Sequence, residues 1–237
     1  MFEWFGRKRS QPEISAGGSV IRRYPKKQWA SARLGSQGQD AALLVEARKE
    51  VYRRLFGEPS AVSEEQRPLL PRIDVHTYFR RGPEGRSICT LVTSGMSDLE
   101  MNVPSDTGAP RRVELIFYCV EPHREYIDTM RWLAHFPHDQ RTWIGAGHTV
   151  PNGDPPAPFW GSKTLDTVLF VPPIVKKDAT LPLELQPGGE GVHFLWMVPL
   201  TTPECNLKLE RGLAAILDLF EQNRHPHVFD ANRAGYV

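Results

Sequence analysis

The sequence has no long apolar run and little cysteine, and each absence excludes a class of protein. No stretch of the 237 residues approaches the roughly 20 consecutive apolar residues that span a membrane. The charged N-terminus, MFEWFGRKRSQPEIS, is not followed by the apolar segment that a secretory signal needs. Cys89, Cys119 and Cys205 are far apart in apolar surroundings, which is typical of buried thiols and not of a disulfide framework. We therefore expect a cytoplasmic protein with no membrane segment.

The sequence also lacks the motifs of metal and cofactor sites. It has no Cys-x-x-Cys pair, and GAGHTV (residues 145–150) lacks the third glycine and the following helix of a phosphate-binding loop. His135 and His138 have a spacing that can chelate a metal on a helix, but Pro137 stands between them and breaks the required geometry. We expect no metal and no cofactor.

Positive charge is concentrated at the N-terminus. The net charge is +1, yet residues 1–33 hold eight Lys or Arg and two Glu, so this segment carries +6 and the rest of the chain −5. One interpretation is a nucleic-acid-binding arm, which would make the protein a regulatory scaffold that contacts nucleic acid through its basic N-terminus. The interrupted basic run and the acidic body favour a solvated or loosely docked extension, which could equally meet an acidic protein. The Gly/Ser-rich SARLGSQGQ marks a boundary, which predicts a basic extension over residues 1–38 and a domain over residues 39–237.

Hydrophobic periodicity in the domain predicts an α+β fold, with helices packed in layers on a mixed, largely antiparallel sheet. A helix is expected from Asp40 to Gly57, and a second one ends at Pro137. A third starts with Thr202, followed by Pro203 at the first helical position, and has one apolar stripe. The stripe consists of Leu209, Leu213, Ile216, Leu217 and Phe220. The predicted strands lie in RIDVHTYF (72–79) and SICTLVTSG (87–95), which form a hairpin, and in RRVELIFYCVE (111–121), RTWIGAGHTVPNG (141–153), LDTVLFVPPIV (165–175) and GVHFLWMVPL (191–200).

The segment LVTSGMSDLEMNVP (91–104) places small hydroxyls, a glycine and a carboxylate at a strand end, as in hydrolases that expose a nucleophile. The glycine–serine–glycine spacing of a nucleophile elbow is absent, and no helix follows. A hydrolase that uses His148 with Ser97 and Asp98 stays open as an alternative, because geometry defines a triad. The favoured interpretation is structural: Gly95 supplies a turn with positive φ, and Ser97 and Asp98 bond nearby backbone amides.

Four tryptophans suggest a binding function. Trp132 and Trp196 lie in strongly patterned elements and are expected in the core. Trp143 and Trp160 flank a Gly/Pro-rich loop, where they either anchor a partner or pack that loop onto the sheet. Because no catalytic motif is found, the residues favour binding over catalysis.

The order of these segments resembles the suppressor-of-fused domain family, from about Ile73 to Arg233. The resemblance rests on the Thr-x-Gly-Met-Ser turn, on VELIFYCVEP, on MRWLAHFPHDQRTWIGAGHTVPNG, on the Pro-x(4)-Glu that opens the last helix, and on DANR. It implies a non-enzymatic protein-binding domain. Animal members sequester a transcription factor in Hedgehog signalling and carry a second domain, whereas bacterial members are commonly single-domain and many look like immunity proteins that neutralise toxins.

This chain ends shortly after the last predicted helix and so resembles the bacterial type, with a cognate toxin domain as the expected partner. The family's binding surface includes an aromatic residue at a helix end, matched by Phe136, and the loop before a histidine, matched by His148. With the loop tryptophans, the predicted partner-binding residues are Phe136, Trp143, His148 and Trp160. Animal members have an acidic residue where this chain has Gly147, which argues against a Hedgehog-type ligand.

Overall fold

The computed structural model describes residues 13–24, 39–67, 69–81, 87–173 and 191–237. Its centre is a seven-stranded sheet in the order β3-β4-β5-β6-β9-β8-β7, in which only the β6–β9 pair is parallel. The mixed, largely antiparallel sheet of the predicted α+β fold is therefore confirmed. The strands are β3 (Ala61–Ser63), β4 (Asp74–Arg81), β5 (Ser87–Ser94), β6 (Val113–Cys119), β7 (Thr149–Pro151), β8 (Leu165–Val171) and β9 (His193–Thr201).

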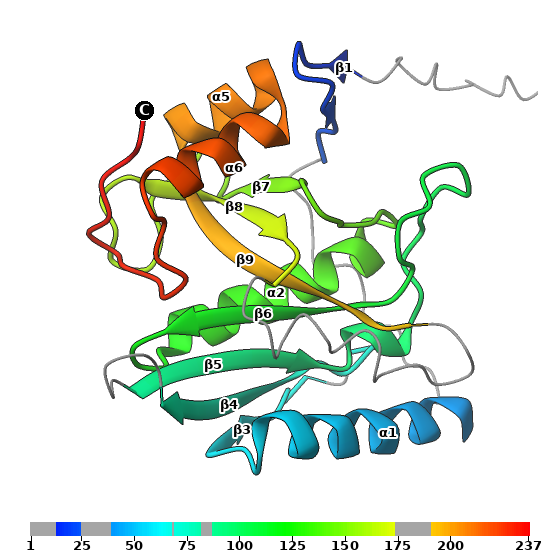
Figure 1. Ribbon diagram of the computed structural model, residues 1–237. Coiled ribbons are helices and arrows are strands. Elements are labelled where there is room, and N and C mark those ends of the chain that lie inside the picture. Colours follow the sequence, from blue (N-terminus) through cyan, green and yellow to red (C-terminus); the bar gives the residue numbers. More distant parts are fainter. Residues whose placement is uncertain (1–12, 25–38, 68, 82–86, 174–190) are drawn as a thin grey trace, which may run out of the picture.

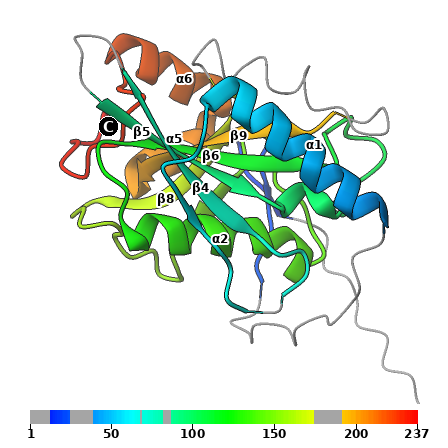
Figure 2. The ribbon, with the colours of Figure 1, turned by 90° about the horizontal axis from the view of Figure 1, so that it is seen from below.

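Helices cover both faces of this sheet (Figures 1 and 2). One face packs on α2 (Arg124–Asp139), and the other packs on α1 (Gln39–Phe56) and α6 (Leu213–Gln222). Side chains alternate between two cores because successive strand residues point to opposite faces. In β6, Leu115 and Phe117 enter the α2 core, while Ile116 and Tyr118 enter the α1/α6 core. This burial on both faces explains the continuous apolar run of β6.

The proline in the second helix does not end it, contrary to the prediction. α2 continues through Pro137 to Asp139. A proline removes one N–H donor, but the amides beyond it still find acceptors: Gln140 N–H donates to Phe136 O, and Thr142 N–H donates to Pro137 O. The last turn therefore closes with the proline buried inside it.

The predicted third helix is two helices, α5 (Thr202–Arg211) and α6, separated by Gly212. Gly212 has φ 87° and ψ 176°, a conformation that side chains disfavour and that turns the chain. The single apolar stripe is therefore wrong: Ile216 is fully buried, whereas Leu217 is 44% exposed. The start also shifts by one residue, because Thr201 is the N-cap in a capping box with Glu204.

Part of the predicted N-terminal extension packs on the domain. Residues 13–24 form a small hairpin of β1 (Glu13–Ile14) and β2 (Val20–Ile21), which lies beside α5 in Figure 1. Gly17 N–H donates to Leu209 O at 2.7 Å, and Lys208 Nζ donates to Ser19 Oγ at 2.9 Å. Residues 1–12 and 25–38, with the predicted boundary at residue 38, lie outside the described residues.

Within the described residues, no helix has the length and apolarity required to cross a membrane.

Candidate functional site

The turn that follows β5 closes a buried charge network. Asp98 and Ser97 lie in the short 3₁₀ helix η2 (Met96–Asp98), and both accept hydrogen bonds from Arg48 of α1, at 2.6 Å and 3.1 Å respectively. Ser97 Oγ also donates to Glu114 of β6 at 2.6 Å. Gly95 has φ 132°, and a Cβ there would stand 1.9 Å from Arg72 O. The predicted positive-φ turn is confirmed, but the partners of Ser97 and Asp98 are side chains of distant elements and not nearby backbone amides.

Electrostatics in this network favour a structural role. Burial raises the pKa of the Glu114 carboxyl, against the opposing effects of Arg48 and of hydrogen bonds from Ser97, Thr93 and Gly95. Burial also lowers the pKa of Arg48, but Glu114 and Asp98 outweigh it, so the guanidinium pKa rises. The charges neutralise one another inside the protein, and Ser97 is fully buried.

The structure does not assemble the alternative hydrolase site. Ser97 contacts Glu114 on β6, whereas His148 lies directly before β7. Strands β9 and β8 separate β6 from β7, a width of about 14 Å at the usual strand spacing. Asp98 is paired with Arg48 and does not orient the histidine. No nucleophile–base contact therefore joins these three residues.

The two histidines of α2 have separate partners. His135 Nε2 lies 2.9 Å from Glu65 Oε1, and His138 Nε2 lies 3.1 Å from Met96 O. Among the residues that the structure describes, no group of three or more potential ligands is placed to hold a metal ion.

Three of the predicted binding residues lie in one region, which we call the aromatic face: Phe136, Trp143 and His148. The rings of Trp143 and His148 are 4.2 Å apart, and Phe136 is at the C-terminal end of α2. Tyr24 of the N-terminal segment joins the two parts, because its ring lies 5.1 Å from that of Phe136 while its hydroxyl donates to Thr142 Oγ1 at 2.7 Å. All three side chains are half-buried.

The turn that carries His148 is fixed to the sheet. Gly147 N–H donates to Phe170 O at 2.7 Å, and Phe170 N–H donates to His148 O at 3.0 Å. Burial lowers the pKa of the His148 imidazole to about 4, and the nearby positive charges of Lys208 and Arg22 lower it in the same direction. The aromatic face therefore presents a neutral imidazole at pH 7.

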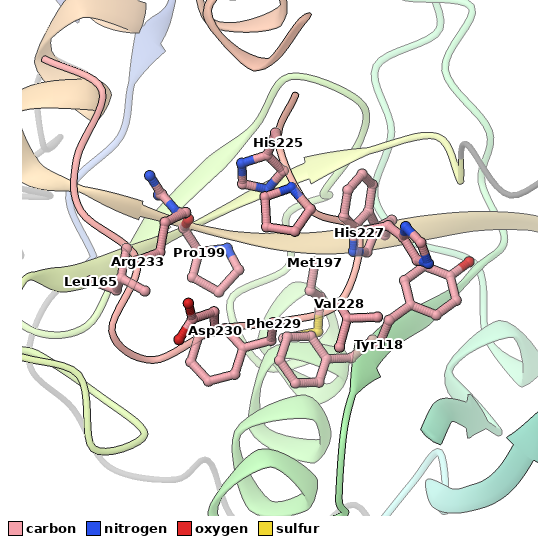
Figure 3. Close-up of a pocket in the computed structure, with 13 residues that line it drawn as sticks. Tyr118, Leu165, Met197, Pro199, His225, His227, Val228, Phe229, Asp230 and Arg233 are labelled. Atoms are coloured by element: carbon pink, nitrogen blue, oxygen red, sulfur yellow. The ribbon is translucent and has the colours of Figure 1, made fainter. Parts of the chain in front are cut away.

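A pocket lies between strands β6 and β9 and the C-terminal segment, residues 225–233 (Figure 3). This segment is held in place, since Phe229 N–H donates to Tyr118 O at 2.8 Å and Arg233 makes two hydrogen bonds of 2.7 and 2.8 Å to Glu204. The lining is mostly apolar and ring side chains. Of its two charged lining residues, Arg233 is paired with Glu204, and the carboxylate of Asp230 accepts a hydrogen bond from the Asn232 amide at 2.9 Å.

The family model described as Suppressor of fused protein (SUFU) matches residues 70–234. The chain belongs to the SUFU family. A comparison with curated protein sequences found no match.

Solved structures share this SUFU fold. A SUFU homolog from Neisseria gonorrhoeae FA 1090 superimposes with a TM-score of 0.61 at 17% identity, covering 83% of this chain and 98% of that one. The Sufu–Fu complex gives 0.53 at 11% identity, covering 83% and 92%. Drosophila Suppressor of Fused gives 0.53 at 10% identity, covering 81% of this chain and 50% of that protein.

The fourth predicted binding residue, Trp160, does not lie on the surface of this SUFU domain. Only 6% of it is exposed, and its ring packs between Phe117 and Tyr126 in the α2 core. Its Nε1 donates to Thr129 Oγ1 at 3.0 Å. The backbone adopts φ 58°, which is rare for a bulky residue and persists here because the indole is fully engaged. Of the two loop positions, only Trp143 meets the expectation of an accessible aromatic ring.

The structure also gives a physical reason for a glycine at position 147. Gly147 has φ 84°, and a Cβ at this position would come within 3.2 Å of Leu213 Cδ2. A side chain here would require an unfavourable backbone conformation and a small shift of the Leu213 side chain.

Sequence reasoning missed Arg48 and Tyr24. Arg48 occupies the apolar stripe of α1, three residues before Val51, and this polar residue on a buried face is a readable signal. Tyr24 follows Arg22 and Arg23 in a segment without apolar periodicity, so no local pattern indicates its contact with α2. Arg23 pairs with Glu13, and Arg22 is exposed; the other basic residues of the extension lie outside the described residues.

Proposed function

We propose that this SUFU domain is a bacterial immunity protein that binds a toxin domain in the cytoplasm through its aromatic face and neutralises it without catalysis. The observation that carries the proposal is the contact between the half-buried rings of Trp143 and His148, 4.2 Å apart on a turn fixed to the sheet. Rigid aromatic side chains of this kind dominate the affinity of protein interfaces, because they bury much area at little entropic cost.

Two further observations support binding over catalysis. The histidine of the face is neutral and has a tryptophan ring, not a nucleophile, as its neighbour. One solved relative of the fold is a complex, named Sufu–Fu. A stable complex buries on the order of 800 Å² per partner, so the interface extends beyond these three side chains. Trp160 packs in the α2 core and is not part of the proposed face.

The test begins with a toxin domain encoded beside the gene for this chain. Calorimetric titration with that purified domain measures its Kd for the wild type and for Trp143→Ala and His148→Ala. We expect each change to weaken binding at least tenfold, as for central aromatic residues of an interface. Phe79→Ala is the matched control, because Phe79 is 49% exposed on β4, near the opposite edge of the sheet. The proposal would be contradicted if Phe79→Ala lost as much affinity for the toxin domain, or if Trp143→Ala and His148→Ala lost none.

A further inference from the structure

Residues 13–24, which we call the N-terminal strap, cross from α5 to the end of α2. At one end, Gly17 lies against the α5–α6 junction, where its amide bonds Leu209 O and where an added Cβ would be 2.3 Å from Gly212 N. At the other end, Tyr24 contacts Phe136 and Thr142. A segment far from α2 in the sequence therefore occupies part of the aromatic face.

The strap also reaches the histidine of this face. Arg22 lies close enough to His148 to contribute to the lowered pKa of the imidazole. Lys208, which holds Ser19 by a 2.9 Å hydrogen bond, acts on the same imidazole. The strap thus reaches two of the three residues of the aromatic face. Tyr24 contacts the ring of Phe136, and the charge of Arg22 acts on His148.

The strap is attached by few contacts. None of its side chains belongs to either hydrophobic core, and Ile14 and Val20 are 65% and 50% exposed. A two-stranded hairpin of this size has little stability of its own. Segments with few buried apolar contacts open at a small fraction of the free energy of global unfolding. The strap can therefore leave while the sheet and its helices stay folded.

We propose that the N-terminal strap is an internal ligand of the aromatic face, and that a protein partner must displace it to bind. The proposal rests on the proposed function, since it takes the aromatic face as the partner surface. Tyr24 occupies the position beside Phe136 and Thr142 that an aromatic anchor of the partner takes. The apparent affinity for a partner then equals the affinity of the open face multiplied by the fraction of molecules in which the face is open.

The first experiment tests whether the strap is separable, by hydrogen exchange on the full chain. Gly17→Ala places a methyl group against backbone atoms of Leu209 and Gly212, so it should expel the strap. We expect rapid exchange across residues 13–24 and unchanged protection of the sheet, for example at the Phe170 amide, which bonds His148 O. Ala16→Val is the matched control, because Ala16 is exposed and its strap should stay protected.

Two results of this experiment would overturn the proposal. Retained protection of the strap in Gly17→Ala would show that the strap does not depend on the α5–α6 junction. Loss of protection throughout the sheet would show that the strap is an integral part of the fold and not a removable ligand.

The second experiment uses a labelled synthetic peptide, EISAGGSVIRRY, which has the sequence of residues 13–24. A tethered segment has an effective concentration of roughly millimolar, so a strap that is closed in the intact chain must bind as a free peptide at or below about this concentration. We expect the peptide to bind the Gly17→Ala chain at least tenfold more tightly than the wild type. Adding Phe136→Ala, or replacing the peptide's tyrosine by alanine, should weaken this binding.

The peptide result is independent of whether the proposed function is correct. No binding at several times the effective concentration estimated above, or binding that ignores both Phe136 and the tyrosine, would overturn the strap as a ligand of this face. If the peptide behaves as expected and the toxin domain does not bind, the proposal about the strap stands and the proposed partner is wrong. If both bind, the toxin domain should have higher affinity for Gly17→Ala than for the wild type and should displace the labelled peptide.

Discussion

Arg48 shows at the scale of one residue how a polar group inside the core holds elements together. It is 2% exposed and bonds Ser94, Ser97 and Asp98, near Glu114. Arg48→Met would leave two buried carboxylates without a counter-charge, and breaking a buried pair in this way costs about 3–5 kcal/mol. We expect this loss in urea unfolding. Lys49→Ala, on the exposed side of α1, should change stability by less than about 0.5 kcal/mol.

Equal stability of Arg48→Met and the wild type would show that the carboxylates protonate or become solvated at no cost. The network would then contribute little to the fold.

Two histidines make stability depend on pH. Burial lowers the pKa of both His148 and His225 to about 4, from a reference value of 6.5. Between pH 6.5 and 4 the unfolded chain binds protons at these positions that the folded chain does not, so the free energy of unfolding falls as pH falls through this range. Below about pH 4 these groups contribute no further loss. Urea unfolding at successive pH values measures the slope.

Replacing both histidines by glutamine should reduce that slope between pH 4 and 6.5, since the titrating groups are gone. An unchanged slope would assign it to other groups, such as His76 and His193, whose pKa values burial also lowers.

Trp160 and Trp143 differ in burial although they flank the same Gly/Pro-rich segment. Trp160→Ala removes a buried indole and should destabilise the protein by about 3–5 kcal/mol. Trp143→Ala should cost clearly less, because that ring is half-buried. Thermal unfolding of the two variants shows which one loses more stability. A larger loss in Trp143→Ala than in Trp160→Ala would contradict the assignment of Trp160 to the core.

At the scale of elements, the sequence predicted where strands lie better than where helices end. Strand positions follow from apolar runs bounded by turn residues: β5, β6, β7 and β8 lie within the predicted segments, and β4 and β9 run past theirs only to Arg81 and Thr201. Two predictions were wrong for the same reason: that a helix ends at Pro137 and that one continues through Gly212. The effect of each residue depends on tertiary partners: Pro137 packs into the core, and Gly212 lies against Gly17. The periodicity of the local sequence indicates neither contact.

The break at Gly212 yields a prediction about α6. Ile216 is fully buried against the α1/α6 core, so Ile216→Ala should cost about 2–5 kcal/mol. Leu217→Ala should cost far less, because this neighbour is 44% exposed after the chain turns. Guanidinium unfolding of both variants checks the difference. Similar losses would support the continuous apolar stripe and contradict the two-helix arrangement.

At the scale of the whole molecule, the candidate site depends on contacts that no local pattern shows. Phe136 and His148 were found from the family resemblance, whereas Tyr24 is 112 residues from Phe136 and contacts it only because the strap crosses the domain. The burial of Trp160 depends likewise on β6, α2 and the C-terminal segment meeting at one point. The order of strands has the same origin, since the parallel β6–β9 pair joins segments far apart in the chain.

Charge on the whole molecule leads to a prediction about association with the proposed partner. The whole chain carries +1, but the residues after 33 carry −5, so their surface would attract a basic toxin domain over distances comparable to the Debye length. That length shrinks from about 30 Å at 0.01 M salt to about 3 Å at 1 M. Stopped-flow mixing should therefore show an association rate that falls steeply with salt, while the dissociation rate, which depends on the short-range contacts of the aromatic face, changes little. An association rate that is flat or rises with salt would mean that the acidic body does not steer the partner and that the encounter depends on apolar contact alone.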